Sequence, residues 1–75
     1  MIVRMTRGHV ELDLAGRHVT VQGEAYRGDP PIFVAYRGML TAWQDGTPLT
    51  DEERETVLAE LRAALADRGM TLDIE

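Results

Sequence analysis

The sequence predicts an α+β fold: an antiparallel β-meander sheet packed on one face by a single C-terminal amphipathic helix, followed by a last short strand. Two observations predict it. Residues 9–22 hold two runs of alternating hydrophobic and polar residues around a short glycine turn. Residues 50–69 combine a helix N-cap, hydrophobic residues at helical spacing and a closing glycine. Because the chain has only 75 residues, we expect a single small domain over 1–75.

The first half of the chain is expected to form the meander. Residues 1–6 are a short β-rich run, and every second residue is hydrophobic in 9–14 and again in 17–22. Ala15-Gly16 between these runs predicts a tight turn, and therefore an antiparallel hairpin. The polar face of the hairpin should be solvated or meet a partner; it carries Glu11, Asp13, His18, Thr20 and Gln22.

The middle of the chain is expected to add two strands after a loop. Gly and Pro residues in 23–31 predict the loop, and the hydrophobic run 32–36 predicts a central strand too apolar to have one exposed face. Residues 39–43 are expected to form a strand that ends at Trp43, before a turn at Asp45-Gly46. Trp43, the only tryptophan, is expected to anchor the core or its edge; the alternative is an exposed hot spot at an interface.

The helix has the clearest local signals. Thr50 is a suitable N-cap and Glu53 completes a capping box, Arg68 would lie in the last turn, and Gly69 follows as the terminating residue, so the helix is predicted over 51–68. Residues 70–75 alternate again and predict the last strand. The hydrophobic stripe of the helix is Val57, Leu58, Leu61 and Leu65.

Composition excludes several kinds of chemistry. The chain has no Cys, Ser or Lys, which excludes disulfides, thiolate metal sites, Schiff-base lysines and serine or cysteine nucleophiles. No phosphate-binding glycine motif is present, so no cofactor is expected. His9 and His18 are interpreted as exposed strand histidines, with a metal pair as the weaker alternative. Glu11 and Asp13 are interpreted as part of a solvated strand face.

The net charge of −5 lies entirely in the second half, because residues 1–45 are neutral and residues 46–75 carry the whole surplus. An acidic chain repels phosphate backbones, which argues against nucleic-acid binding, and attracts a basic partner. No segment is apolar enough to span a membrane, and charges interrupt the N-terminal run, unlike in a signal peptide. We therefore expect a cytoplasmic protein with no membrane contact.

Carboxylates crowd the junction between the turn and the helix. Asp45, Asp51, Glu52 and Glu55 are the candidate partner-binding residues, as an anionic surface for a basic protein. The alternative is that the acidic residues of the first helical turns serve only capping and the helix dipole, with solvated side chains. Helix capping does not require all of them, which favours a partner.

Several motifs carry a resemblance to a known family. They are RGHVEL (7–12), GE (23–24), VAY (34–36) and W-x-D-G-x-P-L-T-x-E-E-R (43–54). Over nearly its whole length the sequence resembles the immunity proteins of bacterial polymorphic toxin systems, in immunity protein family seventy-four. The resemblance implies a cytoplasmic protein that neutralises a cognate toxin by binding it and blocking an active site or an essential surface, without catalysis. The acidic half would suit a basic toxin.

Two other hypotheses remain open. The chain is alternatively a small structural or oligomerisation domain, such as a homodimer formed through the exposed sheet face or an edge strand. A cofactor-free enzyme is the least favoured, because the nucleophiles are missing and no metal or glycine-rich constellation is present.

Overall fold

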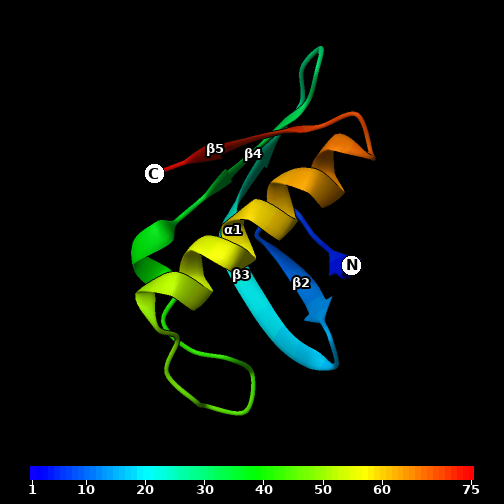
Figure 1. Cartoon of the computed structure of the whole chain (residues 1–75). Coiled ribbons are helices and arrows are strands. Elements are labelled where there is room, and N and C mark those ends of the chain that lie inside the picture. The colour runs from blue at the N-terminus through cyan, green and yellow to red at the C-terminus, as the bar shows by residue number, and fades with distance from the viewer.

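Five strands form one sheet, and a single α-helix lies across one of its faces (Figure 1). The computed structural model describes all of residues 1–75. The predicted α+β fold with one covering helix and a last short strand is confirmed. The elements are β1 (Ile2–Met5), β2 (His9–Leu14), β3 (Arg17–Tyr26), β4 (Ile32–Ala35), the 3₁₀ helix η1 (Arg37–Met39), α1 (Asp51–Ala66) and β5 (Thr71–Ile74).

The strands follow one another in the sheet in the order β1-β2-β3-β4-β5. The first three pairs are antiparallel, as a meander requires, but β5 runs parallel to β4. The chain leaves β4, crosses the sheet through η1 and α1, and returns to the same edge in the same direction. This crossover explains the parallel pair, because parallel neighbours need a long connection that a helix supplies.

The core lies between the sheet and the helix. Val10 and Leu12 of β2 and Val19 and Val21 of β3 are fully buried, which confirms the inward face predicted for the hairpin. The predicted helical stripe is also buried beneath α1. The complete core is Val10, Leu12, Val19, Val21, Phe33, Ala35, Leu40, Trp43, Leu49, Val57, Leu58, Leu61 and Leu65.

Strand β3 is longer than predicted, because it continues through the first part of the expected loop to Tyr26. Its second half pairs with β4, and the Gly23 and Ala25 amides donate to the carbonyls of Gly8 and Arg7 on the other side. Gly23, interpreted as a breaker, is a packing position instead. A Cβ there would overlap the Val34 carbonyl oxygen and lie 2.7 Å from the Phe33 ring.

The prediction of a strand over 39–43 is wrong. Residues 37–39 form η1, and the segment that follows touches a β partner only in one isolated bridge between Ala42 and Pro48. Leu40, Trp43 and Leu49 are its buried residues. Their spacing follows the packing of an irregular loop, not the alternation of a strand. The turn at Asp45-Gly46 is confirmed, since the Gly46 amide donates to the Trp43 carbonyl and Gly46 has a φ of +91°.

Helix α1 ends at Ala66, two residues before the predicted boundary, so Arg68 lies beyond the helix. The termination signal was identified correctly. Gly69 has a φ of +73°, and the amides of Gly69 and Met70 donate to the carbonyls of Ala66 and Leu65. This is the Schellman arrangement that satisfies the last helical carbonyls and turns the chain toward β5.

Strand β4 is central by hydrogen bonding, as predicted, since it lies between β3 and β5. The expectation that neither of its faces is exposed is wrong. Phe33 and Ala35 are buried under the helix, whereas Ile32 on the other face is 39% exposed and Val34 is half-buried. The single helix covers only one side of the sheet, so the opposite side stays open even beside hydrophobic residues.

Both free edges of the sheet carry features that oppose further strand pairing. The amide of Ile74, which points away from β4, donates to the carboxylate of Asp73 at 3.0 Å. On the other edge, the pairing of β1 shifts between Ile2 and Arg4. Occupied amides and irregular register are common protections of edge strands.

Replacing Gly23 with Ala is expected to lower the free energy of unfolding by about 1–3 kcal/mol, because the added methyl group would overlap backbone that cannot move freely. Urea unfolding would measure the loss. Gly8→Ala is the matched control, since a Cβ at Gly8 meets nothing within 4 Å. Equal stability of the two variants would contradict the packing role of Gly23.

Candidate functional site

Trp43 forms the centre of the junction between the hairpin, the irregular loop and the helix. Its side chain is only 7% exposed and belongs to the hydrophobic core, which confirms the predicted anchor role. The loop around it is held by backbone bonds, with the Trp43 amide donating to the Thr47 carbonyl and the Gln44 amide donating to the His18 carbonyl of β3. The indole is therefore fixed in place by both the loop and the sheet.

Arg17, the first residue of β3, covers the tryptophan. Its guanidinium carbon lies 3.9 Å from the centre of the Trp43 ring, which is a cation–π contact. The same guanidinium donates to Glu53 at 3.1 Å, so it links the hairpin turn to the first turn of α1. Both partners are partly exposed, and the pair therefore contributes more to geometry than to stability.

Glu53 joins this cluster to the helix cap. Its carboxylate accepts the Thr50 amide at 3.0 Å, and its own amide donates to the Thr50 hydroxyl at 3.0 Å, which confirms the predicted capping box. The hydrogen bond from the Thr50 amide is the main reason that the pKa of Glu53 is lowered. The nearby Trp43 indole N–H also lowers this pKa, although the indole makes no hydrogen bond of good geometry and is buried without a partner.

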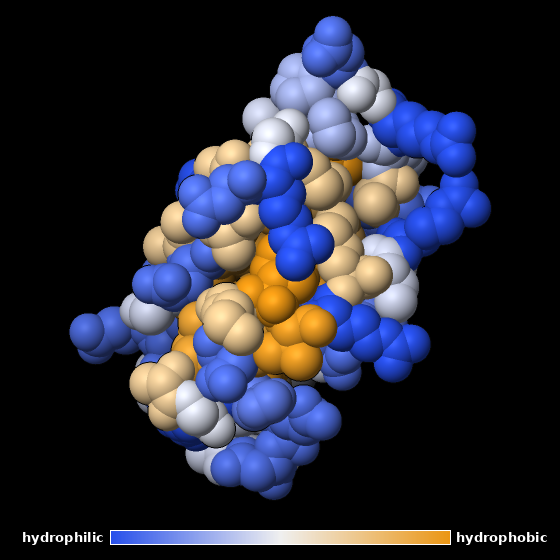
Figure 2. Space-filling model, turned by 90° about the vertical axis from the view of Figure 1, so that its right-hand side faces the viewer, coloured by the Kyte–Doolittle hydropathy of each residue, from blue (hydrophilic) through white to orange (hydrophobic).

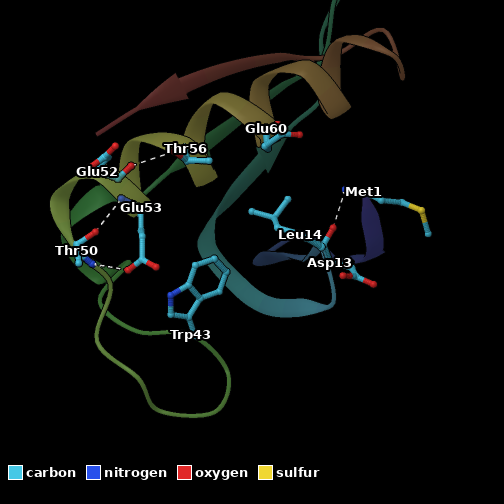
Figure 3. A pocket seen from close by; sticks show the side chains of 10 residues that line it. Met1, Asp13, Leu14, Trp43, Thr50, Glu52, Glu53, Thr56 and Glu60 are labelled. Carbon is cyan, nitrogen blue, oxygen red and sulfur yellow. Dashed lines mark hydrogen bonds between the residues drawn. The ribbon is translucent and has the colours of Figure 1, made fainter.

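A groove of about 610 Å³ opens between the first turns of α1, the Trp43 loop and the turn between β2 and β3 (Figure 3). Figure 3 shows Glu53 extending from the helix toward Trp43, with Leu14 and Asp13 on the opposite wall. We name it the carboxylate groove, and its lining residues are Met1, Asp13, Leu14, Ala15, Trp43, Thr50, Glu52, Glu53, Thr56 and Glu60.

Two of the four carboxylates that line the carboxylate groove, Glu52 and Glu60, have no cationic partner. Glu53 has Arg17 as its partner, and the Met1 amino group donates to the backbone carbonyl of Asp13 at 3.0 Å. Asp13 lies 3.8 Å from His18, and the two form an ion pair only when the histidine is protonated. Glu52 and Glu60 have no ion pair and no side-chain hydrogen bond. The groove thus combines an apolar floor with unneutralised negative charge.

The four predicted partner-binding residues lie on different sides of the junction. Glu52 lines the carboxylate groove, and Asp45 lies at the tip of the loop in a neighbouring hollow that also contains Arg17. Asp51 bonds Arg54 at 2.7 Å, and Glu55 bonds Arg37 at 2.9 Å, so both already have cations of their own chain. Their part in partner binding stays a prediction.

Contacts lower the pKa values of two of these carboxylates, Glu55 and Asp45. The Arg37 guanidinium lowers the pKa of Glu55, and the Thr47 amide, which donates to Asp45 at 2.9 Å, lowers the pKa of Asp45. In return, Glu55 raises the pKa of Arg37. The lowered pKa values keep Glu55 and Asp45 ionised at neutral pH.

The histidines lie at opposite ends of the hairpin. His9 pairs with Gln22 in the register and contacts the Thr6 hydroxyl at 3.1 Å, whereas His18 pairs with Asp13. No group of three or more His, Cys, Asp and Glu side chains is placed to hold a metal ion. The one α-helix is too short and too polar to cross a lipid bilayer.

Two residues of this junction, Glu60 in the groove and Arg17 beside it, were not identified from the sequence. Glu60 is two turns after Glu52 on the same helical face, a spacing that could have been read from the sequence. Arg17 carried no such signal, because its contacts with Trp43 and Glu53 join residues 26 and 36 positions away. Only the folded chain brings these three side chains together.

The chain was also compared with known proteins. The family model described as Immunity protein 74 matches residues 2–75, which is nearly the whole chain. No curated protein and no solved structure matches.

The lowered pKa values of Glu53, Glu55 and Asp45 predict stability that depends on pH. A carboxylate whose pKa is lower in the folded state stabilises the fold above the unfolded pKa, about 4.3 for Glu, and this contribution disappears as pH falls through the folded value. We expect the urea midpoint to fall between pH 6 and pH 3. Glu53→Gln should be less stable at pH 7 and should lose less on acidification. A parallel pH profile for both proteins would contradict the role of Glu53.

Proposed function

The chain belongs to the Immunity protein 74 family, and we propose that it binds a cognate protein toxin and neutralises it by covering its surface, without catalysis. The family match over residues 2–75 is the observation that carries this proposal. The members' shared description implies protection against a toxin, and protection by stoichiometric binding needs no reactive group in the protector. The proposed place of action is the cytoplasm.

The charge of the molecule supports a basic toxin as the partner. The net charge is −5, and the surplus lies in residues 46–75. Five of those acids stand in the first ten residues of α1, at positions 51, 52, 53, 55 and 60. A concentrated negative field accelerates association with a positive surface and repels nucleic acid. The proposed docking surface is therefore the start of α1 with the carboxylate groove.

A second candidate function, self-association, is favoured by one feature of the open sheet face. Tyr26 and Ile32 oppose each other on β3 and β4 and are 50% and 39% exposed. Glu24 accepts the hydroxyls of Tyr26 at 3.0 Å and Tyr36 at 3.1 Å, which raises both tyrosine pKa values and fixes the rings. Rigid exposed tyrosines suit protein contacts. A second copy would pack here and not at the protected sheet edges.

Co-expression with the cognate toxin is expected to restore growth, and the purified pair is expected to form a tight 1:1 complex without turnover. Isothermal titration calorimetry would measure the affinity. Because exposed charges are screened over about 8 Å at physiological ionic strength, added salt should weaken binding. A toxin that kills co-expressing cells and does not bind the purified protein would reject the proposed function.

Charge reversal at Glu52 and Glu55 tests the docking surface separately. The variant Glu52→Arg with Glu55→Arg is expected to bind the toxin more weakly, because two attractive charges become repulsive. Circular dichroism would show that the exposed substitutions leave the fold intact. Unchanged affinity would remove the start of α1 from the interface, while binding by the natural protein would still support toxin neutralisation.

Self-association is tested by light scattering across a concentration series. A dimer that dissociates when Tyr26 and Ile32 are both replaced with Ser is expected if the open sheet face joins two copies. A mass of one chain, 8.4 kDa, at every concentration would exclude this second function.

A further inference from the structure

We propose that the carboxylate groove receives an arginine side chain of the toxin, with its guanidinium between Glu52 and Glu60 and its aliphatic stem along Leu14 and Trp43. This inference rests on the proposed function and specifies how the partner is recognised. The charge of the groove, its apolar floor, the chain's own use of arginine beside it and an unmet donor in its wall all point to this occupant.

The unpaired carboxylates of the groove complement a cationic side chain. Glu52 and Glu60 line the same groove from one face of α1, separated by Thr56, and neither has a cationic partner. Eight residues of helix span about 12 Å, so a guanidinium that bonds both carboxylates requires the two glutamate side chains to lean toward each other along the helix. Elsewhere at the helix start, Arg17, Arg37 and Arg54 each hold a carboxylate. Glu52 and Glu60 are the two acids of α1 left without an arginine.

The groove is lined by both hydrophobic and acidic residues. Leu14, Ala15 and Trp43 give it an apolar floor, and the carboxylates stand along its rim on the helix (Figure 3). A small inorganic cation would not use such a floor, whereas basic side chains bury their methylene stems on apolar surface and keep the charged head at the polar rim. The lining therefore favours a basic side chain over a free ion.

The contacts of Arg17 beside the groove favour arginine over lysine as the occupant. Arg17 shows how this junction binds a guanidinium: it stacks on Trp43 at 3.9 Å and bonds Glu53 at 3.1 Å. Arg17 does not line the carboxylate groove but occupies the neighbouring hollow, which shares Trp43 with it. The planar guanidinium can bond two carboxylates and stack on an aromatic ring at once, which a lysine ammonium does less well.

Trp43, which lines the groove, has a hydrogen-bond donor without an acceptor. The Trp43 indole N–H is buried and makes no hydrogen bond, which is uncommon for a buried polar group. A peptide segment that inserts an arginine also brings backbone carbonyls. Other side chains cover the indole N–H, so one of these carbonyls can accept it only after those side chains move. A protein segment thus satisfies the carboxylates, the floor and the donor together.

The apolar character of this part of the molecule is visible from outside. Figure 2 looks at the side on which the chain begins in Figure 1, and hydrophobic residues gather in its middle within a polar surround. Met1, which lines the carboxylate groove, is 75% exposed. An apolar centre with a charged rim is the usual anatomy of a protein interface.

The test compares two variants with the same change in net charge. Glu52→Gln with Glu60→Gln removes the free groove carboxylates, and Glu11→Gln with Glu75→Gln removes two carboxylates outside the groove. We expect the groove variant to bind the toxin at least about tenfold more weakly and the control to bind within about twofold of the natural protein. Circular dichroism and urea unfolding would show that both variants keep the fold, since all four side chains are at least partly exposed.

The identity of the inserted residue is tested on the toxin. Its surface arginines are replaced one at a time by lysine, and each toxin variant is titrated against the natural protein and the groove variant. Replacement of one particular toxin arginine is expected to reduce the affinity of the toxin for the natural protein but not for the groove variant. This difference indicates that the arginine and the groove carboxylates interact. Additive losses at every arginine would overturn the arginine assignment.

N-acetyl-arginine amide provides a probe that does not need the toxin. In proton–nitrogen NMR spectra, millimolar probe is expected to shift the Trp43 indole signal in the natural protein and not in the groove variant. N-acetyl-norleucine amide, which lacks the charge, should shift it less. Equal shifts with both probes would overturn the role of charge.

The outcomes separate this inference from the proposed function. If the natural protein binds the toxin and the groove variant binds equally well, the groove inference is wrong and toxin neutralisation stands. If the natural protein does not bind the toxin, both are rejected.

Discussion

The contact of Trp43 with Arg17 and the start of α1 is the constraint on which the rest of the structure depends. The chain has no cysteine and is near the lower size limit for a stable domain, so one helix must be held on the sheet by packing alone. Trp43 is buried beside the helix start, Arg17 stacks on it from β3, and Glu53 bonds both Arg17 and the helix cap. These contacts decide where the helix begins and how it lies on the sheet.

The same junction decides how the negative charge is displayed. Three of the arginines are used at the helix start, each holding one carboxylate: Glu53, Glu55 or Asp51. These pairs are largely exposed and add little to stability, but they fix side chains in one orientation. What remains unpaired, Glu52 and Glu60, faces the carboxylate groove. Two of the chain's unpaired acids therefore line a concave, partly apolar place.

Short-range signals accounted for the hairpin, the capping box and the helical stripe. They failed where distant segments meet. Gly23 is a breaker by local propensity, yet β3 continues through it because β4 supplies hydrogen bonds and Phe33 fills the space of the missing side chain. Residues 39–43 have strand-like composition, but they pair only in one isolated bridge, and the loop packs Leu40 and Trp43 individually. The candidate carboxylates were found by composition, but their pairing with Arg37 and Arg54 sorts them into different surroundings.

Local sequence patterns were sufficient to predict the α+β class, the alternation of β2 and β3, the turns at Ala15-Gly16 and Asp45-Gly46, and the helix with its Thr50 and Gly69 ends. Each of these depends on neighbours within a few residues, through backbone periodicity, capping or a positive φ. Only the tertiary structure decided the parallel pairing of β5, the open sheet face and the groove. These depend on which segments return to lie beside one another, and that is set by the burial of the whole core and not by any local pattern.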